Sequence, residues 1–234
     1  MNTEFSTDVV IPGDGVFLGG FLSVPEDARG IVTFAHGSGS SRFSSRNQSV
    51  ARTLNQRGLA TLLFDLLGAD ENERDAVTAE YRFNIPLLAS RLLAGIDWLA
   101  RQPATHLLPV GLFGASTGAA AALIAAAEKP ARVRAVVSRG GRPDLAGAAL
   151  VRVRAPTMLI VGGDDAPVIS LNRQAAQQLG CPHELVIVPG ATHLFEEAGA
   201  LEQVARLAGD WFTRHFAAQA HLTGSTANSR RESL

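Results

Sequence analysis

The chain has 234 residues, of which 46% are hydrophobic and 18% charged, whereas an average soluble domain has about 25% charged residues. This composition excludes a mostly disordered chain, because the apolar residues suffice for a sizeable core. The 21 Lys and Arg residues and 22 Asp and Glu residues give a net charge of −1, so there is no basic excess to attract a nucleic acid.

The predicted elements alternate between strand and helix. In chain order we expect a β-hairpin over 8–24, strand 31–35, helix 47–57, strand 59–64, helix 85–101, strand 107–113, helix 117–128, strand 133–138, a short helix over 144–150, strand 157–161, helix 168–179, strand 184–188 and helix 201–216. Strands this apolar are typical of a parallel sheet with helices on both faces. We therefore predict a doubly wound α/β fold in one domain over 1–220, followed by a flexible polar tail over 221–234.

No membrane partner is expected. The segment 107–127 is uncharged and long enough to cross a bilayer, but glycine, proline and hydroxyl residues interrupt its first half. The single cysteine, Cys181, cannot form an internal disulfide, and residues 1–12 lack the pattern of a signal peptide. A cytoplasmic location is the expectation.

Residues 114–118 read Gly-Ala-Ser-Thr-Gly, which matches the G-x-S-x-G pattern of a nucleophile elbow. The pattern alone is weak, but an apolar strand enters it and an Ala-rich helix leaves it, as an elbow requires. The glycines leave room where a strand turns sharply into a helix. Ser116 is therefore the candidate nucleophile.

A serine nucleophile needs a histidine base, and a carboxylate must orient that base. Of six histidines, His193 has the best position, in the loop after strand 184–188. Asp165 is our candidate carboxylate, although Asp164 beside it remains an alternative because a shift of one residue in the turn would exchange their directions. Asp65 is expected to be a structural residue.

Backbone amides must stabilise the negative charge that develops on the substrate oxygen. The predicted donors are the amides of Thr117, directly after the nucleophile, and of Ser38, in the loop after strand 31–35. Phosphate-binding loops are excluded, because the sole lysine lies outside any Gly-Lys-Ser/Thr motif and no glycine completes a G-x-G-x-x-G pattern at residue 42. We expect no metal and no cofactor.

Six motifs together resemble the α/β-hydrolase superfamily, and within it the dienelactone-hydrolase-like branch of small bacterial hydrolases. These motifs are HGSGSS at 36–41, LLFDLL at 62–67, GASTG at 114–118, SRGGRPDLAG at 138–147, GGDD at 162–165 and GATHLFEE at 190–197. The resemblance covers roughly residues 5–218. It implies the same nucleophile, base, acid and oxyanion-hole residues, and an eight-stranded sheet whose second strand is antiparallel.

The chain departs from this branch in one respect. The type case of the dienelactone hydrolases uses a cysteine in the elbow, where this chain has Ser116. Larger relatives insert a helical cap after the sixth strand, but here only 140–154 could hold one. We expect an open site without a large cap, and a solvated lip over 69–82.

Three arginines, Arg42, Arg139 and Arg142, fall in loops at strand ends. Arg42 and Arg139 are candidates to bind a substrate carboxylate, since guanidinium offers paired donors. The alternative is that the arginines form ion pairs with Asp65, Asp144 or Glu196 and only fix the loops.

The expected function is a serine hydrolase that cleaves a small soluble carboxylic ester through an acyl-enzyme, with the small-molecule ester as its partner. Lactones, thioesters or amides are alternative substrates of the same triad. A catalytically silent binding protein that keeps the fold is the alternative from another class.

Overall fold

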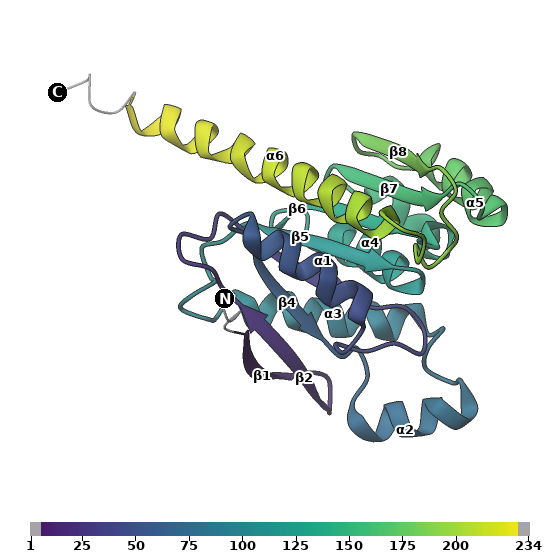
Figure 1. Ribbon diagram of the computed structural model, residues 1–234. Helices are drawn as coiled ribbons and strands as arrows, with labels where there is room; N and C mark the ends of the chain where they lie inside the picture. Colours follow the sequence, from purple (N-terminus) through teal and green to yellow (C-terminus); the bar gives the residue numbers. More distant parts are fainter. Residues whose placement is uncertain (1–5, 229–234) are drawn as a thin grey trace.

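The computed structural model describes the backbone of residues 6–228 and the side chains up to residue 217. One eight-stranded sheet runs through it in the order β1-β2-β4-β3-β5-β6-β7-β8 (Figure 1). The strands are β1 (Ser6–Pro12), β2 (Phe17–Ser23), β3 (Ile31–Ala35), β4 (Ala60–Phe64), β5 (Val110–Ala115), β6 (Val133–Arg139), β7 (Thr157–Gly162) and β8 (His183–Val188). Strand β2 is antiparallel to both of its neighbours, and the remaining pairs are parallel. The predicted α/β-hydrolase fold is confirmed.

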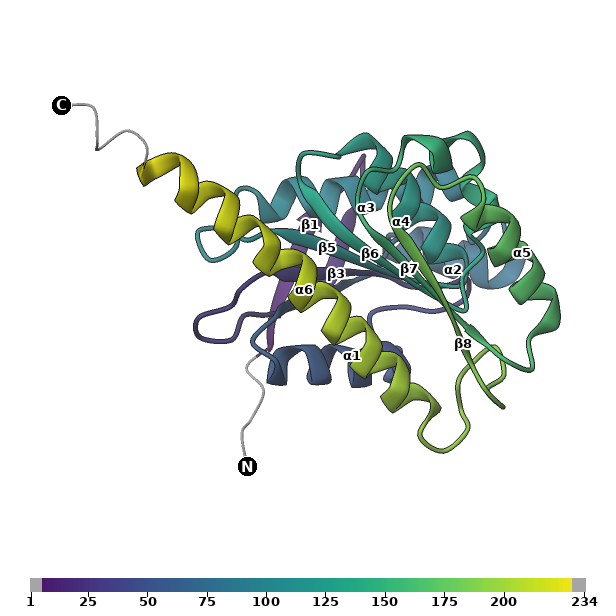
Figure 2. The same ribbon diagram turned by 90° about the horizontal axis from the view of Figure 1, so that it is seen from above.

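Helices cover both faces of the sheet, which explains why its central strands are apolar throughout. On one face, α1 (Ser45–Gln56) and α6 (Ala200–Asn228) pack in a core that includes Phe34 and Phe212. On the other face lie α3 (Ile85–Leu99), α4 (Thr117–Glu128) and α5 (Ala166–Ala176), with their own core. Figure 2 shows the two layers on opposite sides of the sheet.

Local sequence explains where the helices on the two faces begin. The Ser44 side chain accepts a hydrogen bond from the Asn47 amide at the start of α1, and Asn84 accepts one from the Leu87 amide at the start of α3. Such side chains satisfy amides that have no partner inside the helix.

The segment over 69–82, predicted as a solvated lip, contains a helix, α2 (Ala69–Thr78), which projects from one end of the molecule in Figure 1. Ion pairs anchor it. The buried guanidinium of Arg91 donates to Glu71 at 2.8 Å, and Arg82 donates to the buried carboxylate of Asp75 at 2.8 Å. Burial acts to raise the pKa of Asp75, but hydrogen bonds from Arg82 and Tyr81 outweigh it and lower the pKa below its ordinary value.

The connection between β6 and β7 is short. It holds only a 3₁₀ segment, Pro143–Arg152, so there is no large cap, as expected. At the other end of the chain, α6 continues to Asn228, beyond the helix end predicted at residue 216. The part of the predicted tail over 229–234 lies outside the described residues. Within the described part, no helix is both long and apolar enough to cross a membrane.

Candidate active site

Ser116 lies between β5 and α4 with φ of 50° and ψ of −121°. Positive φ is strained for a residue with a side chain, and such strain is typical of a functional position. A Cβ atom at Gly118 would lie 2.1 Å from the Ala35 carbonyl oxygen, and one at Gly114 would lie 2.4 Å from the Cα of Ala119. Both glycines are therefore required for the turn that exposes Ser116.

His193 lies in the loop between β8 and α6, and Asp165 directly precedes α5. The Nδ1 atom of His193 lies 2.7 Å from Oδ2 of Asp165. Because the carboxylate can only accept, Nδ1 carries the proton and Nε2 keeps a free lone pair. Asp165 occupies the position that would cap α5, yet its side chain does not cap the helix. It is turned to the histidine instead.

Asp164, the alternative carboxylate, forms no hydrogen bond to His193. Its backbone amide donates to the Ala191 carbonyl at 3.0 Å, which ties the β7 loop to the β8 loop. This contact holds the two loops together, so that the neighbouring aspartate meets the imidazole.

Ser116 and His193 line one cavity of about 230 Å³. Asp165 stands behind the imidazole, with its side chain 13% exposed. The side chains from three separate strand ends thus meet at one rim of the sheet. A cavity of about 240 Å³ beside α1 has none of these three residues in its lining.

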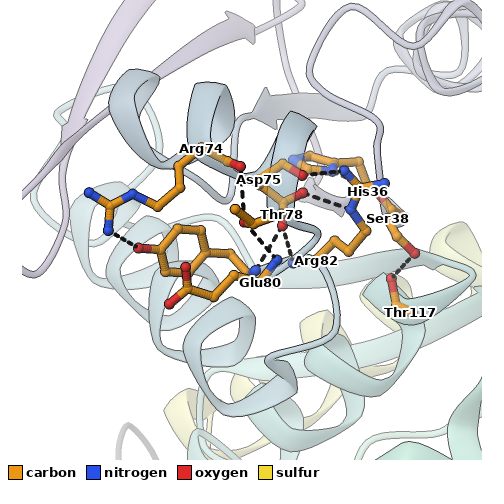
Figure 3. A network of polar contacts seen from close by, with 10 residues as sticks. His36, Ser38, Arg74, Asp75, Thr78, Glu80, Arg82 and Thr117 are labelled. Atoms are coloured by element: carbon orange, nitrogen blue, oxygen red, sulfur yellow. Dashed lines mark hydrogen bonds and ion pairs between the residues drawn. The ribbon is translucent and has the colours of Figure 1, made fainter.

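The loop after β3 lies directly against the nucleophile. A Cβ atom at Gly37 would stand 3.1 Å from the Ser116 Cβ, and the Ser38 hydroxyl lies 3.4 Å from the Thr117 hydroxyl (Figure 3). Among the described residues, neither the Ser38 nor the Thr117 amide donates to a backbone acceptor. Both amides are therefore available to bind an oxyanion near the serine, which keeps Ser38 and Thr117 as the predicted oxyanion-hole residues.

His36 stabilises this loop. Its Nε2 accepts from the Leu66 amide at 3.0 Å, so its Nδ1 must donate to the Gly37 carbonyl, also at 3.0 Å. The Leu66 contact requires the neutral ring, because a protonated Nε2 has no lone pair to accept with. Burial lowers the pKa of His36 below 6.5, in spite of the Gly37 contact and the charge of Asp65, which act to raise it.

The three candidate arginines differ in their contacts. Arg42 forms an ion pair with Asp65 and stacks against the Phe43 ring, and Arg142 donates to Asp144 at 2.8 Å and 2.9 Å. These two fix loops, so we do not assign Arg42 to substrate binding. Arg139 has no ion-pair partner among the described residues and lines the cavity with Ser116.

Helix α1 contributes cavity residues that were not predicted from the sequence. Arg46 and Asn47, in the first turn of α1, line the cavity beside Arg139. The available signal was their position just after the loop 37–41, because the first turn of a helix lies next to the loop that enters it. Among residues 6–217, whose side chains the structure describes, no three His, Cys, Asp or Glu side chains gather as metal ligands would.

Comparison with known proteins shows the family and the fold. The sequence model of the dienelactone hydrolase family matches residues 18–218. A crystal structure of dienelactone hydrolase from Anabaena variabilis is 57% identical, covers 90% of this chain and 98% of its own, and superposes with a TM-score of 0.89. Est1E from Butyrivibrio proteoclasticus, at 18% identity over 90% of this chain and 99% of its own, has a TM-score of 0.75 and shares the fold.

A curated relative in Mycobacterium tuberculosis (strain H37Rv) is 59% identical over 208 residues, which is 89% of this chain and 46% of the relative. It is named a putative phosphoribosyl transferase. The chain therefore spans about half the length of that relative. The family match covers nearly all of the described fold, including every strand end that contributes to the site. The chain belongs to the dienelactone hydrolase family.

Proposed function

We propose that the protein is a serine hydrolase that cleaves small carboxylic esters through an acyl-enzyme. The observation that carries this proposal is the 2.7 Å contact between His193 and Asp165, in a cavity lined by both His193 and Ser116. A carboxylate that is hydrogen-bonded to an imidazole, with a serine hydroxyl lining the same cavity, supports the assignment of Ser116 as an activated nucleophile.

In the first half of the reaction, His193 Nε2 accepts the proton of the Ser116 hydroxyl as Oγ bonds to the carbonyl carbon of the ester. The carbonyl oxygen becomes negative and binds the amides of Ser38 and Thr117. The carbon–oxygen bond to the alcohol then breaks, and the alcohol leaves with the proton from the imidazolium. Asp165 stabilises the imidazolium while it exists.

In the second half, water takes the place of the alcohol. His193 accepts a proton from the water as its oxygen bonds to the acyl carbon, and the same proton returns to Ser116 when the acyl bond breaks. The products are one carboxylic acid and one alcohol. Every step uses groups of the chain and water.

The substrate is proposed to be small and polar. The cavity of about 230 Å³ has few apolar side chains in its lining, Leu194 being the largest. Long acyl chains need apolar surface to leave water, so short and soluble esters fit the site better.

Lactones are the second candidate substrates, and the family match supports them. The same steps open a lactone, except that the alcohol stays attached to the acid. Transferase activity is not proposed, because the name of the mycobacterial relative belongs to a chain of which this one spans less than half.

The test is a panel of p-nitrophenyl esters and simple aryl lactones, assayed with the wild type and Ser116→Ala. We expect turnover that favours acetate and butyrate over palmitate, and a loss in Ser116→Ala of about 10³-fold or more. Ser90→Ala, at a surface helix position, is the matched control and should keep wild-type rates. Turnover that survives Ser116→Ala would contradict the proposal, and so would a wild type that cleaves no member of the panel.

A further inference from the structure

We infer that Asn172 is a positioning residue for the nucleophile and the base: it fastens the loop 139–142, which supports both of them, to helix α5. This inference rests on the proposed hydrolase function and adds a residue on which its geometry depends. Asn172 is not part of the lining of the cavity beside Ser116, so it acts through the residues that it holds in place.

The loop 139–142 holds the backbone of the nucleophile from both sides. The Ser116 amide donates to the Arg139 carbonyl at 3.2 Å, and the Ser116 carbonyl accepts from the Arg142 amide at 3.0 Å. A strained backbone such as that of Ser116 persists only where the surrounding contacts fix it, and these two hydrogen bonds are such contacts. The position of the nucleophile therefore depends on the position of this loop.

The same loop lies against the base. Gly140 has a φ of 50°, and a Cβ atom there would lie 3.0 Å from the His193 carbonyl oxygen and 3.6 Å from its imidazole Cε1 atom. The Gly140 amide donates to the Ile160 carbonyl of β7 at 2.8 Å. A shift of the loop would therefore move Ser116 relative to His193.

A buried side chain of α5 fastens the loop. The Nδ2 atom of Asn172 donates to the Gly141 carbonyl at 2.9 Å and to the Val168 carbonyl, one turn earlier in α5, at 2.8 Å. Both partners are acceptors, so the atom that faces them is the amide nitrogen. Because α5 begins directly after Asp165, the contact with Gly141 joins the support of the serine to the helix that follows the carboxylate.

This position is a costly one for an amide. Asn172 is fully buried, on the face of α5 that also carries Val168 and Ala175, where the helical period favours an apolar residue. Its Oδ1 atom is buried and has no hydrogen-bond partner among the described residues. A buried acceptor without a partner costs free energy, which a leucine would avoid. A requirement for the contact with Gly141 accounts for an asparagine here.

Loss of this contact should slow the chemistry and spare the binding of substrate. The residues that line the cavity do not include Asn172, so its replacement leaves the groups that contact the substrate unchanged. A displacement of reacting groups by about 1 Å can lower a rate by about 10²-fold. We therefore expect a lower kcat at a nearly unchanged KM.

The first experiment measures hydrolysis of p-nitrophenyl acetate by two variants. Asn172→Leu removes the donor at a similar volume, and Asn172→Ser keeps a donor for Val168 on a side chain too short for Gly141. Both should lower kcat by about 10- to 100-fold and keep KM within about threefold of wild type. Thr105→Val is the matched control. Thr105 is also fully buried and donates to the Leu99 carbonyl at 2.8 Å, but it precedes β5, whereas the nucleophile follows β5. This control should lower Tm by a similar amount and keep kcat.

A second comparison separates positioning from a general loss of stability. In a His193→Ala background the serine has no base with which it must align, so Asn172→Leu should slow fluorophosphonate labelling of Ser116 by less than about threefold there. In the wild-type background the same substitution should slow it by about tenfold or more. Equal fold-changes in the two backgrounds, or a wild-type kcat in either folded variant of Asn172, would overturn the inference.

Hydrogen exchange measured by NMR separates this inference from the proposed chemistry. The Arg142 amide, which donates to the Ser116 carbonyl, should exchange faster by about tenfold or more in Asn172→Leu and Asn172→Ser, and at the wild-type rate in Thr105→Val. If it does so while the wild type cleaves no ester, the proposed function fails and the role of Asn172 in holding the loop stands. If exchange is unchanged in both variants of Asn172, that role is refuted even if esters are cleaved.

Discussion

At the scale of single residues, the fold of the loop after β7 determines which of two adjacent aspartates is hydrogen-bonded to His193. Asp164 and Asp165 are adjacent and chemically identical, and the sequence leaves both open. Their separation is a tertiary effect, because the Asp164 amide bonds to the β8 loop and turns the next side chain toward His193.

Exchange of these two carboxylates for amides tests the assignment. Asp165→Asn should lower kcat/KM by about 10²–10⁴-fold, because the amide cannot stabilise the imidazolium and can hold the ring in the wrong tautomer. Asp164→Asn, the matched control, should stay within about threefold of wild type. Esterase kinetics of the two purified variants measure both values, and a larger loss in Asp164→Asn would reverse the assignment.

Other residues were predictable to different degrees. The elbow at 114–118 has a sequence pattern because the turn itself demands glycine on each side of Ser116. The partners of the arginines have no such pattern. Whether Arg42 meets Asp65 or a substrate depends on how the loops after β3 and β4 fold together, which no local preference determines.

At the scale of elements, the loop after β3 depends on its two supports. His36 joins it to the Leu66 amide just after β4, and the loop that follows α2 places Arg82 so that a Cβ atom at Gly39 would lie 3.7 Å from its guanidinium. A small cavity is lined by His36, Ser38, Asp75 and Arg82 together. The segment over 69–82 therefore backs the predicted oxyanion loop.

The support from His36 makes stability depend on pH. Its pKa in the folded chain lies below the ordinary value of 6.5, so the unfolded chain binds a proton first as the pH falls. The stabilisation is complete above pH 6.5 and is lost as the pH decreases from there toward the folded pKa. Burial also lowers the pKa of His215, so its contribution to the free energy of unfolding likewise decreases as the pH falls.

Urea unfolding at pH 7.5 and 5.5 measures this effect. The wild type should lose free energy of unfolding between the two values. His36→Gln keeps an acceptor for the Leu66 amide but cannot titrate, so it should be less stable at pH 7.5 and lose less on acidification. The contribution of His215 is common to both proteins and cancels in the comparison. An equal loss in the two proteins would show that His36 does not titrate in this way.

Element positions followed from the sequence where the apolar pattern is strong, as in α3 and β3. The strand predicted from residue 107 begins only at Val110, because Leu107 is exposed.

The position of helix α2 did not follow from the sequence, because half of its ten residues are charged and no apolar stripe marks them. Ion pairs from Glu71 to Arg91 of α3 and from Asp75 to Arg82 of the following loop anchor it. Pairing between charged side chains leaves no apolar periodicity in the sequence.

At the scale of the whole molecule, the site follows from topology. Strands β5, β7 and β8 are parallel, so their carboxyl ends share one edge of the sheet, and the loops that follow them bring Ser116, Asp165 and His193 together. The convergence of these three residues at one edge could be predicted from the parallel direction of their strands. The shape of the cavity could not, because α1 contributes Arg46 and Asn47 to it.

The proposed hydrolysis depends most on Ser116 being a nucleophile that His193 activates. The direct measurement is treatment of the folded protein with a fluorophosphonate, followed by intact mass and peptide mapping. We predict one adduct per chain, on Ser116, none in Ser116→Ala, and labelling slowed by about 10²-fold or more in His193→Ala. No adduct on the folded wild type, or an adduct on another residue with Ser116 unmodified, would contradict the account.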